Sequence, residues 1–338
     1  MVRKKALALL GLLLLASFAF GQQIVLKAST SAVPDDWHAK ALYYFAEYVH
    51  KADPSIKIEV YPANQLFKQD AQLPAMIRGN LDFAYVSAQQ LSTFLDDVAP
   101  LTAGYVIQNP EHFCAVWEGG FGQKLKDKVG QQLHITLLAP LYLGTRQLDL
   151  RIEKEIRTPD DLAGVKLRMP NTKTWLFLGK ALGANPVPMP FSEVYLALQT
   201  GTIDGQDNPL PTTYRAKFYE VTKQIVLTSH LVDGILLAVS NKALEKLTPR
   251  QQEILHEAAY AASYFNNQAR LAEEQRLIEF FKSQGLKVYK PDVEAFRKRV
   301  LNAYLNSDFS KNWPAGVLDE IQSYAKNIPA ACQFLFRP

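Results

Sequence analysis

The sequence is poor in the residues that build disulfide scaffolds and metal centres. It has 2 cysteines and 6 histidines among 338 residues, too few cysteines for a disulfide-rich scaffold or a four-cysteine zinc site. The histidines show no HExxH motif or other close ligand spacing, so we expect no metal and no cofactor. Cys114 and Cys332 could form one disulfide or remain two small buried apolar residues, and the sequence leaves both alternatives open.

Signatures of catalysis and nucleotide binding are also absent. No GxGxxG motif follows an expected strand, and the chain has neither a Walker loop nor a GxSxG nucleophile elbow. The formal net charge of +4 is too small to indicate a nucleic-acid partner. The chain is 48% hydrophobic and 21% charged, which excludes a disordered chain and a membrane protein with many spans.

The N-terminus has the features of a secretory signal peptide. The basic stretch MVRKK precedes an apolar run at 6–15, and the small residues Ala19 and Gly21 then match a signal-peptidase site. We expect cleavage after Gly21, which leaves a nearly neutral mature chain. A retained membrane anchor is the alternative, but the run is shorter than the roughly 20 residues of a membrane span. No later stretch is long and apolar enough, so the mature protein should be soluble and periplasmic.

Strands and helices are expected to alternate along most of the chain. Strands at 24–29, 56–61 and 81–86 are separated by helices at 37–51 and near 71–78. This order is typical of βαβ units in a parallel or mixed sheet. A second α/β run follows, with helices expected at 172–182 and 192–198 and separate strands expected at 133–140, 144–150, 165–169, 225–229 and 235–240.

A very long helix is expected towards the C-terminus. Thr248 and Pro249 form a helix start, and residues 250–284 contain no glycine or proline. Such a helix is roughly 50 Å long at about 1.5 Å per residue, which exceeds the width of a small domain. The chain length suggests about two domains, so we expect this helix to lie across both.

An exported α/β chain without a catalytic signature is typical of a solute-binding protein. One alternative is an exported enzyme that acts on organic acids, which would need a nucleophile or base beside Arg168. The sequence offers none. Another alternative is a binding protein of an ABC transporter or of a sensor kinase.

Three stretches carry a specific resemblance. They are GTR at 144–146, TPDDLAGVKLRMP at 158–170 and PVPMPFSEVYLALQTGTIDGQDNP at 186–209. They closely resemble the solute-binding proteins of tripartite ATP-independent periplasmic (TRAP) transporters, the DctP-type family. Residues 65–87, 247–259 and 291–300 extend the resemblance over nearly the whole mature chain. The chain departs at Gln206-Asp207-Asn208, where Glu-Asn is usual, which shifts one acid and keeps the asparagine in register.

The resemblance implies an α/β, two-domain periplasmic binding protein of the Venus-flytrap type, with a ligand cleft between the domains. Domain I would comprise 22–143 and 233–273, and domain II would comprise 144–232 and 274–338 with the C-terminal helices. The resemblance also implies delivery of a small carboxylate to the small and large integral membrane subunits of a TRAP transporter driven by an ion gradient.

Two arginines are the main candidates for holding the carboxylate. Arg168 ends an expected strand before Pro170, where open α/β domains bind ligands. Its guanidinium can grip a carboxylate through two parallel hydrogen bonds, as the resemblance also implies. The resemblance places Arg146 near the same group, although Arg146 could instead pair with Asp149 or Asp160.

The remaining candidates are polar or aromatic. The resemblance implies that Asn208 donates to the carboxylate and that Phe191 packs on the ligand. Gln72, Tyr85 and Trp175 complete the expected set. Five further candidates are Trp37, Gln69, Asp70, Ser87 and Tyr195. For these five, as for Gln72, Tyr85 and Trp175, an ordinary role in core packing or in a solvated loop is an alternative of at least equal weight.

Overall fold

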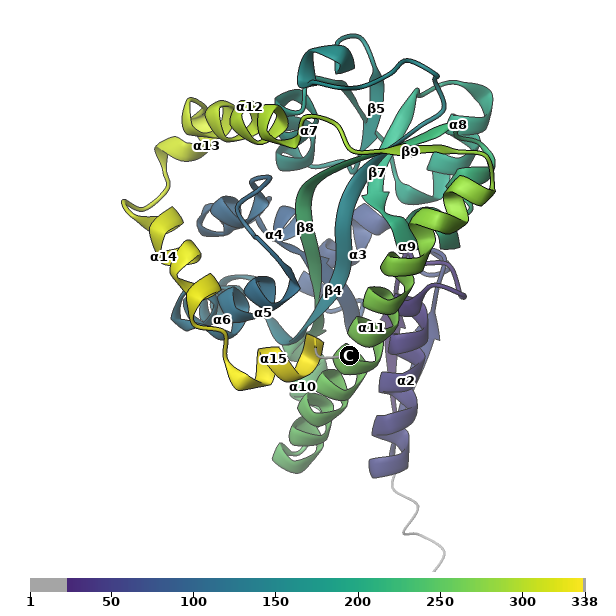
Figure 1. Ribbon diagram of the computed structural model, residues 1–338. Helices are drawn as coiled ribbons and strands as arrows, with labels where there is room; N and C mark the ends of the chain where they lie inside the picture. Colours follow the sequence, from purple (N-terminus) through teal and green to yellow (C-terminus); the bar gives the residue numbers. More distant parts are fainter. Residues whose placement is uncertain (1–22, 337–338) are drawn as a thin grey trace, which may run out of the picture.

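The computed structural model describes residues 23–336, so the expected signal peptide at 1–21 lies outside the described residues. Within them, one sheet of nine strands runs through the molecule and helices cover its faces (Figure 1). The strands are β1 (Ile24–Ser29), β2 (Ile56–Tyr61), β3 (Phe83–Ser87), β4 (Ile135–Leu150), β5 (Lys166–Met169), β6 (Asn185–Pro188), β7 (Gly205–Pro209), β8 (Gln224–Ser240) and β9 (Lys287–Tyr289).

One set of helices lies between β1 and β4 in the chain, and the other set follows β5. No helix within residues 23–336 is both long and apolar enough to cross a membrane. The helices are α2 (Trp37–Ala52), α3 (Gln69–Ile77), α4 (Ala88–Leu91), α5 (Pro110–Glu118), α6 (Gly120–Leu133), α7 (Lys173–Ala181), α8 (Val194–Thr200), α9 (Leu210–Arg215), α10 (Asn241–Leu244), α11 (Pro249–Ser283), α12 (Val293–Leu305), α13 (Asp308–Lys311), α14 (Val317–Ser323) and α15 (Ala330–Phe336).

The sheet has two halves of the same design. In one half β1 pairs in parallel with β2 and β3, and β8 adds to β3 in the antiparallel direction. In the other half β5 pairs in parallel with β6 and β7, and β4 adds antiparallel to β7. The halves meet where β4 pairs with β8. Parallel neighbours need crossover connections, and helices supply them here, which confirms the predicted βαβ organisation.

The prediction of separate strands at 133–140 and 144–150, and at 225–229 and 235–240, is wrong. Each pair forms one long strand, β4 and β8, and these pair from Ile135 opposite Ser240 to Leu150 opposite Gln224 with three register shifts. Gly144, with a φ of 132°, interrupts the alternation that marks a strand in sequence. The pairing between β4 and β8 maintains the strands across such interruptions, so both carry the chain from one half of the sheet to the other.

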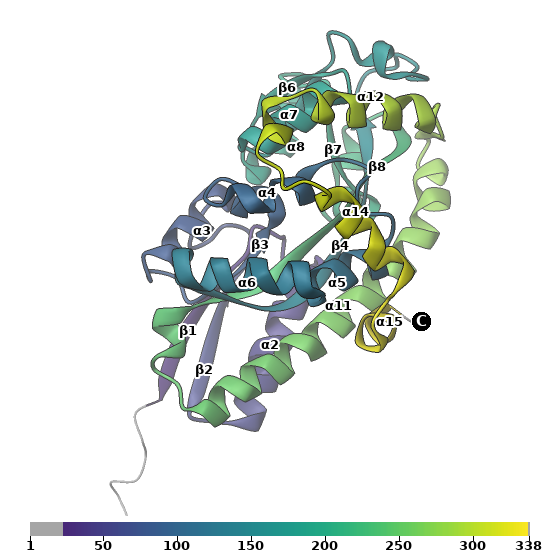
Figure 2. The same cartoon turned by 90° about the vertical axis from the view of Figure 1, so that its left-hand side faces the viewer.

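The predicted long helix is confirmed as α11, which has 35 residues. Its first turn is capped by Thr248 and Gln251, whose side chains and backbones bond reciprocally. Ile254 packs into the core beneath β1 and β8, whereas Leu277 and Phe281 pack beside the other end of β8. The helix therefore runs along both halves of the sheet (Figure 2).

Cys114 and Cys332 form a disulfide, which settles the alternative that the sequence left open. The bond joins α5 to α15, and both cysteines are fully buried. The limits of the two domains stay a prediction. The disulfide ties the end of the segment expected in domain II to α5, within the segment expected in domain I.

Candidate ligand-binding site

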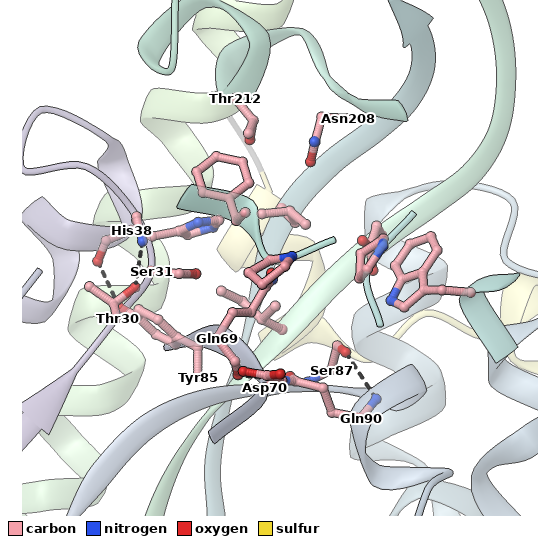
Figure 3. Close-up of a pocket in the computed structure, with 18 of the residues that line it drawn as sticks. Thr30, Ser31, His38, Gln69, Asp70, Tyr85, Ser87, Gln90, Asn208 and Thr212 are labelled. Carbon is pink, nitrogen blue, oxygen red and sulfur yellow. Dashed lines mark hydrogen bonds between the residues drawn. The ribbon is translucent and has the colours of Figure 1, made fainter. Parts of the chain in front are cut away.

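A pocket lined by charged, polar and apolar side chains lies between the two halves of the sheet, and all seven main candidates line it. It measures about 1000 Å³ when the space open to solvent is included. Tyr85 and Gln72 come from β3 and α3, and the others come from β4 or later elements. In Figure 3, Asn208 and Thr212 enter from one side, and Gln69, Asp70, Ser87 and Gln90 face them from the other.

The further candidates divide into two groups. Gln69, Asp70 and Ser87 also line the pocket. Trp37 and Tyr195 are instead engaged by carboxylates elsewhere, because the Trp37 indole donates to Glu273 and the Tyr195 hydroxyl donates to Glu220. Sequence reasoning missed several lining residues that belong to no motif, and they include Thr30, Ser31, Asp36, His38, Gln90, Asn171, Thr172, Thr212 and Asp233.

Arg168 is a buried cation that has no carboxylate partner within residues 23–336. Only 1% of the residue is exposed, and strand β5 directs it to the pocket. Its Nε donates to the Met189 carbonyl at 2.9 Å, and Nη2 donates to Gln69 Oε1 at 3.4 Å. Among residues 23–336 no acidic oxygen lies within 4.0 Å of the guanidinium. Burial lowers the pKa of Arg168 to about 9, so the side chain is charged at neutral pH and costly to bury unpaired.

Arg146 also lines the pocket, but two acids already engage it. Nε donates to Asp207 Oδ2 at 2.7 Å and Nη1 donates to Asp233 Oδ2 at 2.9 Å. The alternative pairings of Arg146 with Asp149 or Asp160 are wrong, because β7 and β8 place Asp207 and Asp233 closer. Asp207 is the acid at the departure from the family pattern, and it still reaches the arginine.

Aromatic stacking and a histidine complete this charge network. The Arg146 guanidinium lies 4.3 Å from the Trp175 ring centre, which is a cation–π distance. His230 Nε2 lies 3.1 Å from Asp207 Oδ2. Burial lowers the pKa of His230, so the ring is neutral at neutral pH. The positive charge of Arg146 is therefore compensated before any ligand arrives.

Asn208 is held through an amide relay that ends at Asp149. Its Nδ2 donates to Gln206 Oε1 at 2.5 Å, and Gln206 Nε2 donates to Asp149 Oδ2 at 3.1 Å. One hydrogen of the Asn208 amide is thus occupied, while the second hydrogen and the oxygen are free of partners within residues 23–336. The residue can both donate to and accept from a ligand.

The acid at the end of the relay makes stability depend on pH. Burial raises the pKa of Asp149 to about 7, above the ordinary value of 3.8. Asp149 therefore loses its proton at a lower pH in the unfolded chain than in the folded protein. As a result, the free energy of unfolding falls as the pH rises from about 4 to about 7. Asp149→Asn should raise the free energy of unfolding at pH 8 by on the order of 2 kcal/mol. Thermal unfolding at pH 4.5 and pH 8 should show the gain only at the higher pH.

The matched control for Asp149→Asn is Asp127→Asn, since Asp127 is exposed and, within the described residues, its side chain accepts only from Gln123. The control should change the melting temperature little at either pH. Destabilisation by Asp149→Asn at both pH values would show that the buried carboxyl is ionised and required.

The first half of the sheet supplies uncharged polar groups opposite the arginines, in addition to the acids Asp36 and Asp70. The Tyr85 hydroxyl donates to the His38 carbonyl at 3.0 Å, and Gln72 Nε2 donates to the Phe67 carbonyl at 3.2 Å. Ser87 and Gln90 cap α4 reciprocally, since the side-chain oxygen of each accepts from the backbone N–H of the other. Phe191 adds an aromatic edge, with its ring 5.6 Å from that of Phe218. Hydrogen-bonding groups and apolar surface thus surround the charged end of the pocket.

An α/β fold in two similar halves, with a pocket between them and a buried arginine directed into it, is typical of a solute-binding protein. The family description "DctP: Bacterial extracellular solute-binding protein, family 7" matches residues 28–311. The chain belongs to this family, which serves TRAP transporters. The prediction of the family is therefore confirmed.

Relatives and solved structures agree with this membership. The sialic acid-binding periplasmic protein SiaP of Vibrio cholerae is 35% identical over 259 residues, which is 77% of this chain and 80% of that relative. A TRAP periplasmic solute-binding protein of Roseobacter denitrificans with bound 3-deoxy-D-manno-oct-2-ulosonic acid (KDO) is 44% identical, with a TM-score of 0.86, over 89% of this chain and 99% of that chain. A second protein from that organism, with bound L-galactonate, is 28% identical with a TM-score of 0.81, over 90% and 99% of the two chains.

These similarities confirm the α/β, two-domain periplasmic binding fold. Members of the family are solute-binding proteins, so the prediction that the chain is not an enzyme is also confirmed. The family is periplasmic, binds small acids and works with membrane transporter components.

Proposed function

We propose that the protein captures a small organic acid as its monoanion in this pocket and delivers it to the membrane subunits of a TRAP transporter. The observation that carries the proposal is the buried Arg168, which has no carboxylate partner within residues 23–336. A ligand carboxylate would supply the missing partner through a bidentate pair. Asn208 lines the same pocket and has an amide hydrogen available for a further hydrogen bond.

The pairing of the charged groups in and behind the pocket wall favours a single carboxylate. Arg146 pairs with Asp207 and Asp233, and Arg270 pairs with Asp36, whereas Arg168 has no acidic partner among the described residues. One bound carboxylate would lie on Arg168, whereas a second would find no uncompensated cation. Burying an unpaired charge is very costly, so monocarboxylates are favoured over dicarboxylates.

The ligand class we favour is the polyhydroxylated sugar acid. The pocket wall is rich in hydroxyl and amide groups, including Thr30, Ser31, Gln69 and Asn171. Two similar solved structures have bound sugar acids, KDO and L-galactonate, and a similar curated protein is named for sialic acid. All three acids carry one carboxylate and several hydroxyl groups. The proposed ligand shares this chemistry.

The proposed place of action is the periplasm, after removal of residues 1–21. The buried disulfide supports this, because such bonds form and persist in oxidising compartments outside the cytoplasm. The expected partners are one small and one large integral membrane subunit. Transport of the bound acid by cells that carry those subunits, and its loss on deletion of this protein, would test the delivery step.

A thermal-shift screen of KDO, L-galactonate, N-acetylneuraminate and succinate tests ligand capture. The sugar acid that is the true ligand should stabilise the protein by about 2.7 kcal/mol when its concentration is 100 times its dissociation constant. The methyl ester of the same acid should bind at least roughly 100-fold more weakly, because it leaves the guanidinium of Arg168 unpaired. An ester that binds within tenfold of the acid, or succinate as the tightest ligand, would contradict the proposal.

A further inference from the structure

A second group of polar side chains in the pocket is held by Arg270 of helix α11. Arg270 is fully buried, and its Nη1 donates to Asp36 Oδ1 at 2.7 Å while its Nη2 donates to Thr212 Oγ1 at 2.7 Å. Its Nε donates to the Leu143 carbonyl at 2.6 Å. Asp36, Thr212 and Leu143 line the pocket. One guanidinium thus fixes a carboxylate before α2 and a hydroxyl in α9 as close neighbours.

Asp36 and Thr212 can each make one more hydrogen bond than they make within residues 23–336. Asp36 Oδ1 accepts from the His38 backbone N–H at 2.9 Å as well as from Arg270, whereas Oδ2 has no hydrogen-bond partner within residues 23–336. Thr212 Oγ1 accepts from Arg270, so its own hydrogen remains to be donated. Both residues are nearly buried, at 4% and 6% exposure. The pocket therefore presents one unused acceptor beside one unused donor.

Burial and the charge of Arg270 determine the protonation states of Asp36 and His38. Burial opposes ionisation of Asp36, but the charge of Arg270 lowers its pKa overall, so Asp36 is a carboxylate that can only accept. Burial and the charge of Arg270 lower the pKa of His38 to about 3, so its ring is neutral. No cation besides Arg270 faces Asp36 within 4.0 Å among the described residues, since the ring of His38 is uncharged. This wall of the pocket has no free positive charge.

We propose that Asp36 and Thr212 form a subsite for ligand hydroxyl groups, with Arg270 as the positioning residue that holds them. The proposal rests on the proposed function, in which Arg168 holds the carboxylate. A hydroxyl group donates and accepts, so it satisfies both the free Asp36 oxygen and the Thr212 hydrogen. A methylene group leaves both unpaired, and a second carboxylate meets the negative charge of Asp36.

The subsite selects polyhydroxylated acids from other acids of the same length. Thr212 enters the pocket across from Ser87 and Gln90 (Figure 3). Arg168 and Asp36 use separate sets of partners, Met189 and Gln69 for the former and Arg270 and His38 for the latter. Carboxylate recognition and hydroxyl recognition can therefore be lost independently.

Thr212→Val separates the two kinds of recognition, because valine keeps the shape of threonine and removes only the hydroxyl. The probes are KDO, L-galactonate and hexanoate, the last of which has the chain length of galactonate without hydroxyls. By calorimetry, the wild type should bind the better sugar acid at least roughly 100-fold more tightly than hexanoate. Thr212→Val should lower that affinity roughly 10–100-fold and leave hexanoate unchanged. Hexanoate binding below detection in both proteins agrees with this expectation.

Two further variants complete the test. Asp36→Asn keeps an acceptor for Arg270 and a cap for α2 but loses the charge, and it should show the same selective loss. If thermal unfolding shows that Asp36→Asn does not fold, the affinities of Thr212→Val alone test the subsite. Thr102→Val is the matched control, because Thr102 is a buried threonine outside the pocket whose hydroxyl donates to the Ala99 carbonyl. It should bind all probes as the wild type does.

The outcomes distinguish the subsite from the carboxylate site. An equal loss for sugar acid and hexanoate in Thr212→Val, no loss for the sugar acid, or a wild type that prefers hexanoate would overturn the subsite. A wild-type affinity for KDO or L-galactonate in Arg168→Ala, together with a selective loss in Thr212→Val, would overturn the carboxylate site and leave the hydroxyl subsite standing.

Discussion

Replacing Arg168 by alanine should lower the affinity for the acid ligand by roughly 10²–10⁴-fold, because a carboxylate buried without its partner costs about 3–5 kcal/mol. The side chain is 1% exposed and bonds only neutral protein groups, so the ligand would be its one anionic partner in the described chain. Calorimetry with the tightest acid from the thermal-shift screen measures the loss. Arg168→Lys should also bind poorly, since an ammonium group cannot make the planar fork.

The same substitution should leave the ligand-free protein at least as stable as the wild type. Burial depresses the pKa of Arg168, so the empty pocket holds its charge at a cost to folding. The melting temperature without ligand should stay equal or rise, while the shift on adding ligand disappears. Arg78→Ala is the control, because Arg78 is exposed and outside the pocket. A near-native affinity in Arg168→Ala would show that Arg168 does not hold the carboxylate.

Local signals in the sequence predicted the elements that local interactions define. The cap at Thr248 and the absence of glycine and proline predicted α11 to within a residue at each end. Thr172 likewise caps the helix that is predicted to begin there. The long strands β4 and β8 were predicted as fragments, because only their pairing with each other carries them across Gly144 and its neighbours. Such pairing is not encoded in any short window.

In the candidate site, too, local sequence signals predict some residues, whereas contacts between distant parts of the chain determine the others. Arg168 and Asn208 could be predicted because each ends a strand in a motif that resembles the family, and both line the pocket. The partners of Arg146 could not, since Asp207 and Asp233 lie 61 and 87 residues away in sequence. Asp36 meets Arg270 across 234 residues. Contacts at such separations depend on the assembled sheet, which is why the sequence alone did not identify Asp36 or Thr212.

Removing the disulfide should cause a large loss of stability although it changes no residue of the pocket. Cys114 and Cys332 are separated by 218 residues, and both are fully buried. A cross-link that closes a loop of this length restricts the unfolded chain, which the loop-entropy account values at about 5 kcal/mol. The double variant Cys114→Ala, Cys332→Ala should therefore lose about 2–5 kcal/mol in urea unfolding. Reduction of the wild type should reproduce the loss.

Removal of the disulfide should increase local opening of α15 before it affects the rest of the chain. Without it, α15 is held by contacts such as the Phe334 ring stacked on Tyr264 at 4.9 Å and the Phe336 ring 6.1 Å from Tyr142. Hydrogen exchange should accelerate in α15 before it accelerates in α5 if these contacts give way locally. Neither cysteine lines the pocket, so ligand affinity should change less than threefold while stability falls. A double variant that unfolds at the wild-type urea concentration would show that packing of α15, rather than the cross-link, secures the C-terminal segment.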